Sequence, residues 1–216
     1  MGKLELSHHH NVDAVLNKKL SLFQEVRDLP PWRAVAFGCA LLERMLPNYR
    51  LFCTTTEFTD SKVMDNLLQI LWSWIIDPKT KINFDVQLEK LEEITPDPEN
   101  FDHFGVYPAL DCAMSMAALF NLMNKEDEQG AVVVCKLSQG SVEAFIDFTE
   151  PDISDSEVRN QLVKQHPLMQ WEIATQVEII EYVKSHERGK TMVKALRDLA
   201  LREGVSNIGI EIPPLQ

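Results

Sequence analysis

The most apolar segment of the chain is ALDCAMSMAALFNLM, residues 109–123. Its apolar side chains recur all around a helical cylinder, which predicts a helix buried on several sides. Pro108 stands where a proline in the first turn would open that helix. The segment is shorter than the roughly 18 apolar residues that cross a bilayer, and it carries Asp111, Ser115 and Asn121. We therefore expect a core helix and no membrane-spanning segment.

Helical spacing of apolar residues continues on both sides of this segment. Residues 31–46 are also apolar nearly all round, and Pro47 should end that helix. Asn83 is a suitable N-cap, and Ser154 with Glu157 forms a capping box. The predicted helices are residues 12–28, 31–46, 61–76, a helix from 84, 109–123, 129–148, a helix after 154–157, a helix that opens at 167, and 191–202.

The three consecutive valines at 132–134 also suit a strand. We favour a helix there, because Val134, Leu137, Ser141 and Phe145 keep helical spacing beyond Gly140. The sequence therefore predicts an all-α fold. We expect a flexible tail at residues 1–10 and a single-domain bundle of about eight or nine helices at 11–216.

The last residues have a different pattern. Ile208, Ile210 and Ile212 alternate with Gly209 and Glu211, which is typical of an extended segment. Three isoleucines left in water would promote aggregation. We expect this extended C-terminal tail to pack on its own bundle, with strand addition to another chain as the alternative.

Charge and cysteine usage restrict the partners. The 216 residues carry 33 acidic and 21 basic side chains, a net charge of −12. Such a field repels nucleic acid and anionic lipid, so neither a nucleic acid nor a membrane is an expected partner. The N-terminus has no signal-peptide pattern, which favours a cytoplasmic protein. The four cysteines form no CxxC pair, and we expect buried, reduced thiols.

Familiar catalytic motifs are missing from the sequence. It contains no GxGxxG or Walker loop, no GxSxG, no HExxH and no pair of Glu-x-x-His motifs. The triplet His8–His10 could bind a stray metal, but adjacent histidines in a flexible end rarely form a specific site. We therefore expect no cofactor and no physiological metal.

Polar residues inside apolar helices are the remaining candidates. Glu43 and Arg44 either form a salt-bridge network or bind a polar ligand. Asp111 is either a buried carboxylate with a raised pKa or, as we favour, a first-turn carboxylate stabilised by the helix N-terminus. Asp85, Glu89 and Glu92 share a helical face that could bind a cation or a basic partner, although such a row is more often a solvated flank.

The same polar residues fall in segments that together resemble one family. These segments are ERMLPNY at 43–49 followed by Phe52, NFDVQLEKLEE at 83–93, GVYPALD at 105–111, and SNIGI at 206–210. In this order they resemble the bacterial YjaG family, over about residues 20–210. The resemblance implies an all-helical bacterial cytoplasmic protein and suggests a link to histidine-kinase signalling. It implies no activity, substrate or cofactor.

These segments supply the candidate site. Its members are polar where a core would want apolar side chains: Glu43, Arg44, Asn48, Tyr49, Asn83, Asp85, Glu89, Asp111 and Asn207. If they meet, they form a buried polar network or a lined pocket. We expect Glu43, Arg44 and Asp111 to share one network near the middle of the bundle.

Three functions remain open on these grounds. The leading hypothesis is a non-catalytic cytoplasmic binding or regulatory module, in which kinase-linked signalling is one version. The alternatives are an enzyme with a carboxylate–arginine pocket and a structural or oligomerisation protein. A water-accessible cleft holding two of the candidate charges favours the enzyme, whereas a broad exposed apolar patch favours the other two. The sequence identifies neither the partner nor the oligomeric state.

Overall fold

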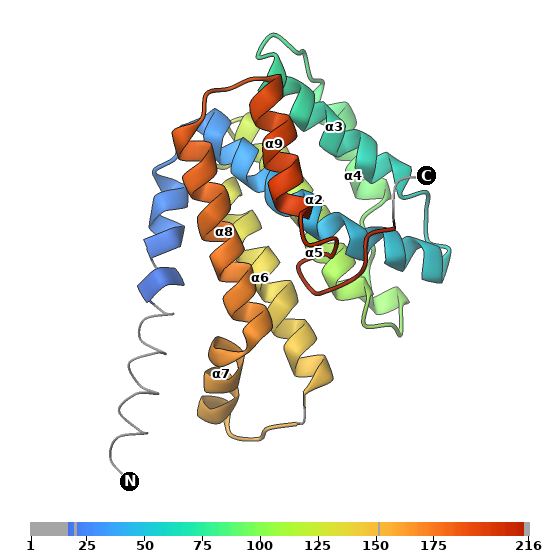
Figure 1. The fold of residues 1–216 in the computed structure, drawn as a ribbon. Coiled ribbons are helices and arrows are strands. Elements are labelled where there is room, and N and C mark those ends of the chain that lie inside the picture. Colours follow the sequence, from blue (N-terminus) through green and yellow to red (C-terminus); the bar gives the residue numbers. More distant parts are fainter. Residues whose placement is uncertain (1–16, 20, 151, 214–216) are drawn as a thin grey trace.

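The fold is all-α, as predicted. The computed structural model describes residues 17–19, 21–150 and 152–213 (Figure 1). Residues 17–19 and 21–27 are helical. They precede α2 (Pro31–Thr56), α3 (Lys62–Ile76), α4 (Phe84–Glu93), a 3-10 turn (Pro98–Asn100), α5 (Val106–Met123), α6 (Gly130–Thr149), α7 (Ser156–Gln165), α8 (Pro167–Ser185) and α9 (Lys190–Leu201). The predicted tail at 1–10 and the predicted helical start at 12–16 lie outside the described residues.

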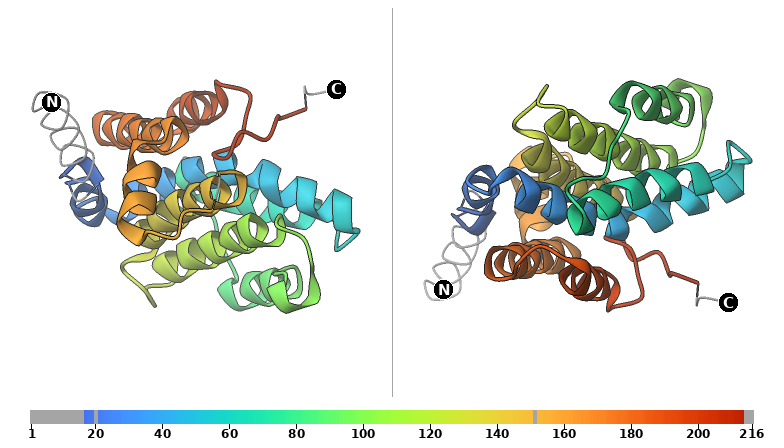
Figure 2. Two further views of the ribbon diagram at one scale, coloured as in Figure 1. Left: turned by 90° about the horizontal axis from the view of Figure 1, so that it is seen from below. Right: turned by 90° about the horizontal axis from the view of Figure 1, so that it is seen from above.

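The long helix α2 lies at the centre of the bundle. Figure 2 shows α8 and α9 on one side of α2 and α6, with α4 and α5 on the other side. Buried side chains cover α2 on nearly every face between Ala34 and Tyr49. Gly38 allows α5 to approach closely, because a Cβ atom there would lie 2.5 Å from a methyl carbon of Leu119. The segment that is apolar all round is therefore central, as its pattern predicted.

The predicted end of this helix at Pro47 is wrong. Pro47 lies inside α2, which continues to Thr56. A proline in a helix interior costs roughly 3 kcal/mol, because it removes a hydrogen bond and crowds the preceding turn. The residues beyond it offset that cost: Tyr49, Phe52 and Cys53 are buried, and burying such a side chain contributes about 1.5–3 kcal/mol. The burial of these side chains therefore outweighs the tendency of Pro47 to end the helix.

Most other predicted boundaries agree with the structure within a few residues. The Asn83 side chain accepts a hydrogen bond from the Val86 N–H and caps α4. The valines at 132–134 are helical, in α6. The capping residue of α7 is Asp155, not Ser154, because the Asp155 carboxylate accepts from two N–H groups in the first turn, those of Glu157 and Val158.

Helix α5 is the most apolar element in the structure as well. By length and composition it could cross a membrane, yet 56% of it is buried inside the protein. Its first turn begins at Val106, two residues before the expected proline. Ala118 of α5 lies against Gly130 of α6, where a Cβ atom would collide with the Ala118 carbonyl oxygen. The two helices are thus packed almost backbone to backbone at this point.

The C-terminal segment packs on the bundle, as predicted, but it is not simply extended. It folds back on itself, with an isolated antiparallel bridge between Val205 and Glu211, the only β-pairing among the described residues. Gly209 adopts φ +84°, a left-handed conformation that glycine tolerates without strain. Ile208 is buried in a small apolar cluster with residues of α6, α7 and α8, and Ile210 packs against that cluster.

Candidate functional site

A buried carboxylate, Glu172 of α8, is the centre of the largest polar cluster. Arg44 donates to it from α2 at 2.6 Å and Ser138 from α6 at 2.6 Å. Gln176, one turn along α8, donates at 2.8 Å. The side chains of Arg44 and Glu172 are only 1% and 0% exposed. Three donors thus satisfy a charge that would otherwise be very costly to bury.

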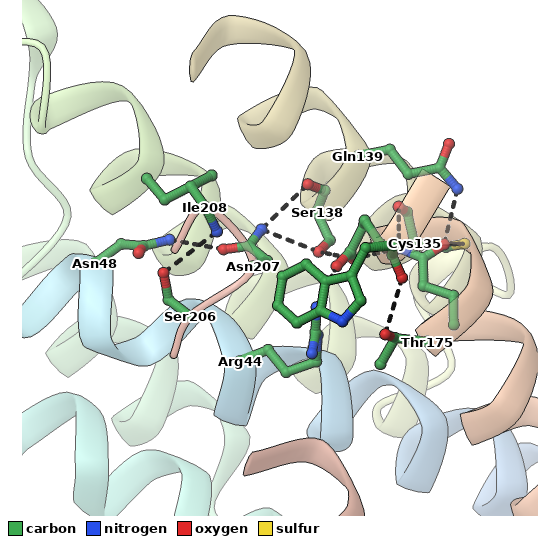
Figure 3. Close-up of polar contacts among 12 residues, drawn as sticks. Arg44, Asn48, Cys135, Ser138, Gln139, Thr175, Ser206, Asn207 and Ile208 are labelled. Atoms are coloured by element: carbon green, nitrogen blue, oxygen red, sulfur yellow. Dashed lines mark hydrogen bonds and ion pairs between the residues drawn. The ribbon is translucent and has the colours of Figure 1, made fainter. Parts of the chain in front are cut away.

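Asn207 connects the C-terminal segment to this cluster. Its amide nitrogen donates to the carbonyl and the hydroxyl oxygens of Ser138, both at 3.1 Å. Its amide oxygen accepts from Asn48 at 2.8 Å, and its backbone N–H donates to the Arg44 carbonyl at 3.1 Å. Figure 3 shows Asn207 between Asn48 and Ser138. One side chain therefore joins α2, α6 and the end of the chain.

Gln176 extends the cluster along α6 and α8. Its amide oxygen accepts from Gln139 at 2.7 Å and from the Cys135 thiol at 3.1 Å. Burial raises the pKa of the Cys135 thiol well above its ordinary value, so the sulfur stays protonated and serves as a donor. We call these eight residues the Glu172 network: Arg44, Asn48, Cys135, Ser138, Gln139, Glu172, Gln176 and Asn207.

The guanidinium of Arg44 is also covered by an aromatic ring. It lies 4.4 Å from the ring centre of Trp171, a cation–π distance. Its Nε is buried and has no hydrogen-bond partner among the described residues. Ring, carboxylate and helices together keep this cation out of water, so the network ties the helices together and offers no open binding pocket at Arg44.

Glu43 belongs to a different cluster. Its carboxylate lies 2.7 Å from Nε of Arg197 on α9, and it accepts from the Trp72 indole of α3 at 2.8 Å. Burial raises the pKa of Glu43, although the Arg197 charge and the Trp72 hydrogen bond hold it partly down. Consecutive helix residues point about 100° apart, so Glu43 and its neighbour Arg44 face different helices.

The prediction that Glu43, Arg44 and Asp111 share one network is therefore wrong. Asp111 is half-buried and accepts from the Ser141 hydroxyl at 2.7 Å. The first-turn interpretation of Asp111 is also wrong, because α5 begins at Val106 and places Asp111 in the second turn. Burial raises the pKa of Asp111, while the Ser141 hydrogen bond lowers it in part. Asp111 is therefore the partly buried carboxylate with a raised pKa, which was the other interpretation of this residue from the sequence.

The remaining predicted site residues lie elsewhere. Tyr49 is buried and donates to the Ile94 carbonyl at 2.6 Å, which fixes the end of α4. Asp85 and Glu89 are exposed on α4. Asn83 and Asp85 line an open hollow of about 550 Å³ beside the end of α5. Of the nine predicted residues, the structure brings only Arg44, Asn48 and Asn207 into the Glu172 network.

Sequence reasoning missed the centre of that network. Glu172 and Gln176 are one turn apart on α8 and interrupt the buried row that also contains Met169, Ile180 and Val183. A carboxylate and an amide inside such an apolar row predict a buried polar network, because buried polar groups need hydrogen-bond partners.

The expectation that the chain binds no physiological metal can be compared with the structure only for the described residues. Among the described residues, no group of three or more His, Cys, Asp or Glu side chains could hold a metal ion. The triplet His8–His10 lies outside them. All four cysteines are buried, as expected.

A cluster of aromatic side chains lies on the surface where α5 begins and α6 ends. Phe104 stacks on Phe148 with ring centres 4.3 Å apart, and its ring centre lies 6.3 Å from Tyr107 and 6.1 Å from Phe145. Tyr107 is 53% exposed and Phe148 is 64% exposed. We call these four residues the aromatic patch. The helical spacing placed Phe145 and Phe148 in the apolar stripe of their helix and did not show that these four rings are exposed together.

Comparison with known proteins gives a consistent result. Residues 21–211 match the family model described as "Protein of unknown function (DUF416)". The chain is 37% identical to "Uncharacterized protein YjaG" of Escherichia coli, over 84% of this chain and 92% of that protein. It is 34% identical to an "Uncharacterized protein" of Haemophilus influenzae, over 88% and 96%. These matches confirm the resemblance to the YjaG family.

A solved structure has the same fold. The crystal structure of a DUF416 family protein from Shewanella baltica superposes with a TM-score of 0.79 at 35% sequence identity. The match covers 88% of this chain and 97% of that chain.

Proposed function

We propose that this chain, which belongs to the DUF416 family, is a non-catalytic binding or regulatory module that docks a partner protein on its aromatic patch. The observation that carries the proposal is the exposure of Tyr107 and Phe148, at 53% and 64%. Clustered exposed aromatics mark interaction sites, because a soluble protein otherwise leaves large apolar side chains in water only singly. Aromatic side chains also supply much of the binding energy at protein interfaces.

The internal charges support binding over catalysis. An enzyme with a carboxylate–arginine pocket needs its charges within reach of a substrate. Arg44 and Glu172 are 1% and 0% exposed and are held by other side chains. Glu43 is 4% exposed and is paired with Arg197. These two ion pairs stabilise the helical bundle, and the aromatic patch lies on its surface.

We further propose that the chain acts in the cytoplasm. A cytoplasmic protein with this surface would act by binding a second cytoplasmic protein, and kinase-linked signalling is one version of that role. A structural or oligomerisation protein would use the same patch to bind another copy of itself. The oligomeric state in solution separates these two possibilities.

Photo-crosslinking in a native lysate tests the proposal. The chain carries a photoreactive amino acid at exposed position 114 of α5, and it is compared with the same chain bearing Phe148→Ala or Ile76→Ala. Ile76 is a matched control because it is 40% exposed on α3. We expect one crosslinked partner band that Phe148→Ala removes and Ile76→Ala keeps.

Two results would contradict the proposal. Crosslinks that survive Phe148→Ala unchanged would show that the patch docks nothing. A crosslinked dimer of the chain itself, matched by a dimer in sedimentation equilibrium that Phe148→Ala dissociates, would favour the oligomerisation protein.

A further inference from the structure

The aromatic patch has a carboxylate beside it. Tyr107 and Asp111 are one turn apart on α5, and Ser141 and Phe145 are one turn apart on α6. Residues at this spacing are neighbours on one helix face. The hydrogen bond from Ser141 to Asp111 joins the two helices, so both aromatic rings lie about one helical turn from the same carboxylate.

The Asp111 carboxylate is only partly used. Ser141 donates to Oδ2. Among the described residues no ion pair involves Asp111, and it is only half-buried. Asp102, two residues before Phe104, is exposed and likewise has no ion pair in the described part of the chain. The patch therefore combines exposed aromatic rings with two unneutralised acidic side chains.

We propose that the patch receives a lysine or arginine side chain from a basic segment of the partner protein. This inference rests on the proposed function and names the chemistry of its partner. The alkyl part of the incoming side chain packs on the aromatic rings. Its cationic end pairs with Asp111, and the ring of Tyr107, one turn away on α5, adds cation–π attraction. The exposed ring of Phe148 offers apolar surface to the neighbouring residues of the segment.

Charge favours a basic protein segment over nucleic acid, anionic lipid or a second copy of this chain as the partner of the patch. Nucleic acid and anionic lipid are repelled by a chain of net charge −12. A second copy would bring its own Asp102 and Asp111 against the same carboxylates, and like charges facing each other across an interface are unfavourable. A basic segment with apolar neighbours matches both the rings and the charge.

Selection from a random dodecapeptide phage library on the immobilised full chain tests this inference. We expect the recovered peptides to be enriched in Lys or Arg next to apolar residues. For one such peptide, Asp111→Asn should weaken binding roughly tenfold, the scale of a partly desolvated cation–π and ion pair. Phe148→Ala should weaken it at least as much, and Ile76→Ala should leave it unchanged.

The control position lies far from the patch. Arg188, which follows α8, donates to the Ile75 carbonyl. Ile76 therefore lies near the C-terminal end of α8. Helices α6 and α8 run antiparallel, with Cys135 opposite Gln176 and Ser138 opposite Glu172. The C-terminal end of α6, which carries Phe148, is thus at the opposite end of the bundle. Replacing the basic residue of the peptide with norleucine is the reciprocal control, and it should match the loss seen with Asp111→Asn.

The possible failures can be told apart. Peptides that lose binding on Phe148→Ala but lack basic residues and ignore Asp111→Asn would overturn this inference and leave the proposed function standing. Peptides that bind the Phe148→Ala chain as tightly as the parent would overturn both. A patch-dependent dimer in sedimentation equilibrium, or patch-dependent binding to phosphatidylglycerol vesicles, would overturn the inference in favour of a second copy or a membrane.

Discussion

Breaking the buried ion pair between Arg44 and Glu172 should strongly destabilise the protein. Arg44→Met keeps a flexible side chain against Trp171 but removes the cation, and Glu172→Gln keeps the shape but removes the anion. Each change leaves a charge that is 1% exposed or less without its partner 2.6 Å away. Breaking such a pair from one side costs about 3–5 kcal/mol, a large part of the roughly 5–15 kcal/mol that stabilises a typical domain.

Urea unfolding at neutral pH, followed by far-ultraviolet circular dichroism, measures this cost. With a slope of about 1–3 kcal/mol per molar urea, the midpoint of each single variant should fall by roughly 1–5 M. The double variant removes both charges, and the amide introduced by Glu172→Gln can still accept from Ser138 and donate or accept at Gln176. We therefore expect it to lose less than the two single variants together, with a coupling of about 1–3 kcal/mol.

Two outcomes would contradict this reasoning. If Arg44→Met and Glu172→Gln each unfold within about 1 kcal/mol of the parent, the pair is not held out of water as its burial indicates. Additive losses in the double variant would show that each side chain acts through separate neighbours.

Three further predictions concern single features. Gly130→Ala should lower the free energy of unfolding by about 1–3 kcal/mol, because the new Cβ would meet the Ala118 carbonyl. Gly140→Ala should raise it by about 0.5–1 kcal/mol in the same urea assay, because no atom lies within 4 Å of a Cβ at that position. Asp111→Asn should raise the melting temperature at neutral pH, and the gain should vanish toward acid pH, because the raised pKa of Asp111 lets the folded parent bind its proton more tightly; a gain independent of pH would contradict it. Deleting residues 206–216 should lower the melting temperature by several degrees in calorimetry, since Ile208 alone contributes about 1.5–3 kcal/mol; an unchanged melting temperature would show that the segment is not docked.

The helices could be predicted from the sequence because their apolar residues repeat with a period of 3.6 and their ends carry recognisable residues. Asn83 caps α4 and Pro167 opens α8 as expected. The burial of Ile208 also followed from the pattern. Local signals failed at Pro47, where the helix continues because the residues beyond it are buried.

The partners of the polar residues could not be predicted. Arg44 and Glu172 are 128 positions apart, and their pairing depends on how α2 and α8 are aligned in the packed bundle. Glu43 and Arg44 are adjacent in the sequence but face different helices, so their closeness along the chain was misleading. The aromatic patch was missed for a related reason, because spacing shows that residues share a helix face and does not show whether another helix covers it.

The position of Asn207 also determines when this protein can finish folding. It bonds with Asn48 across 159 positions, and it follows α9, the last helix that the structure describes. Synthesis proceeds from the N-terminus, so α2, α6 and α8 are all made before the residue that joins them. A nascent chain that has not yet reached residue 207 leaves Asn48 and Ser138 without this partner, and such unpaired polar groups in an interior are costly. The Asn207 bonds can therefore form only after every helix that they join has been made.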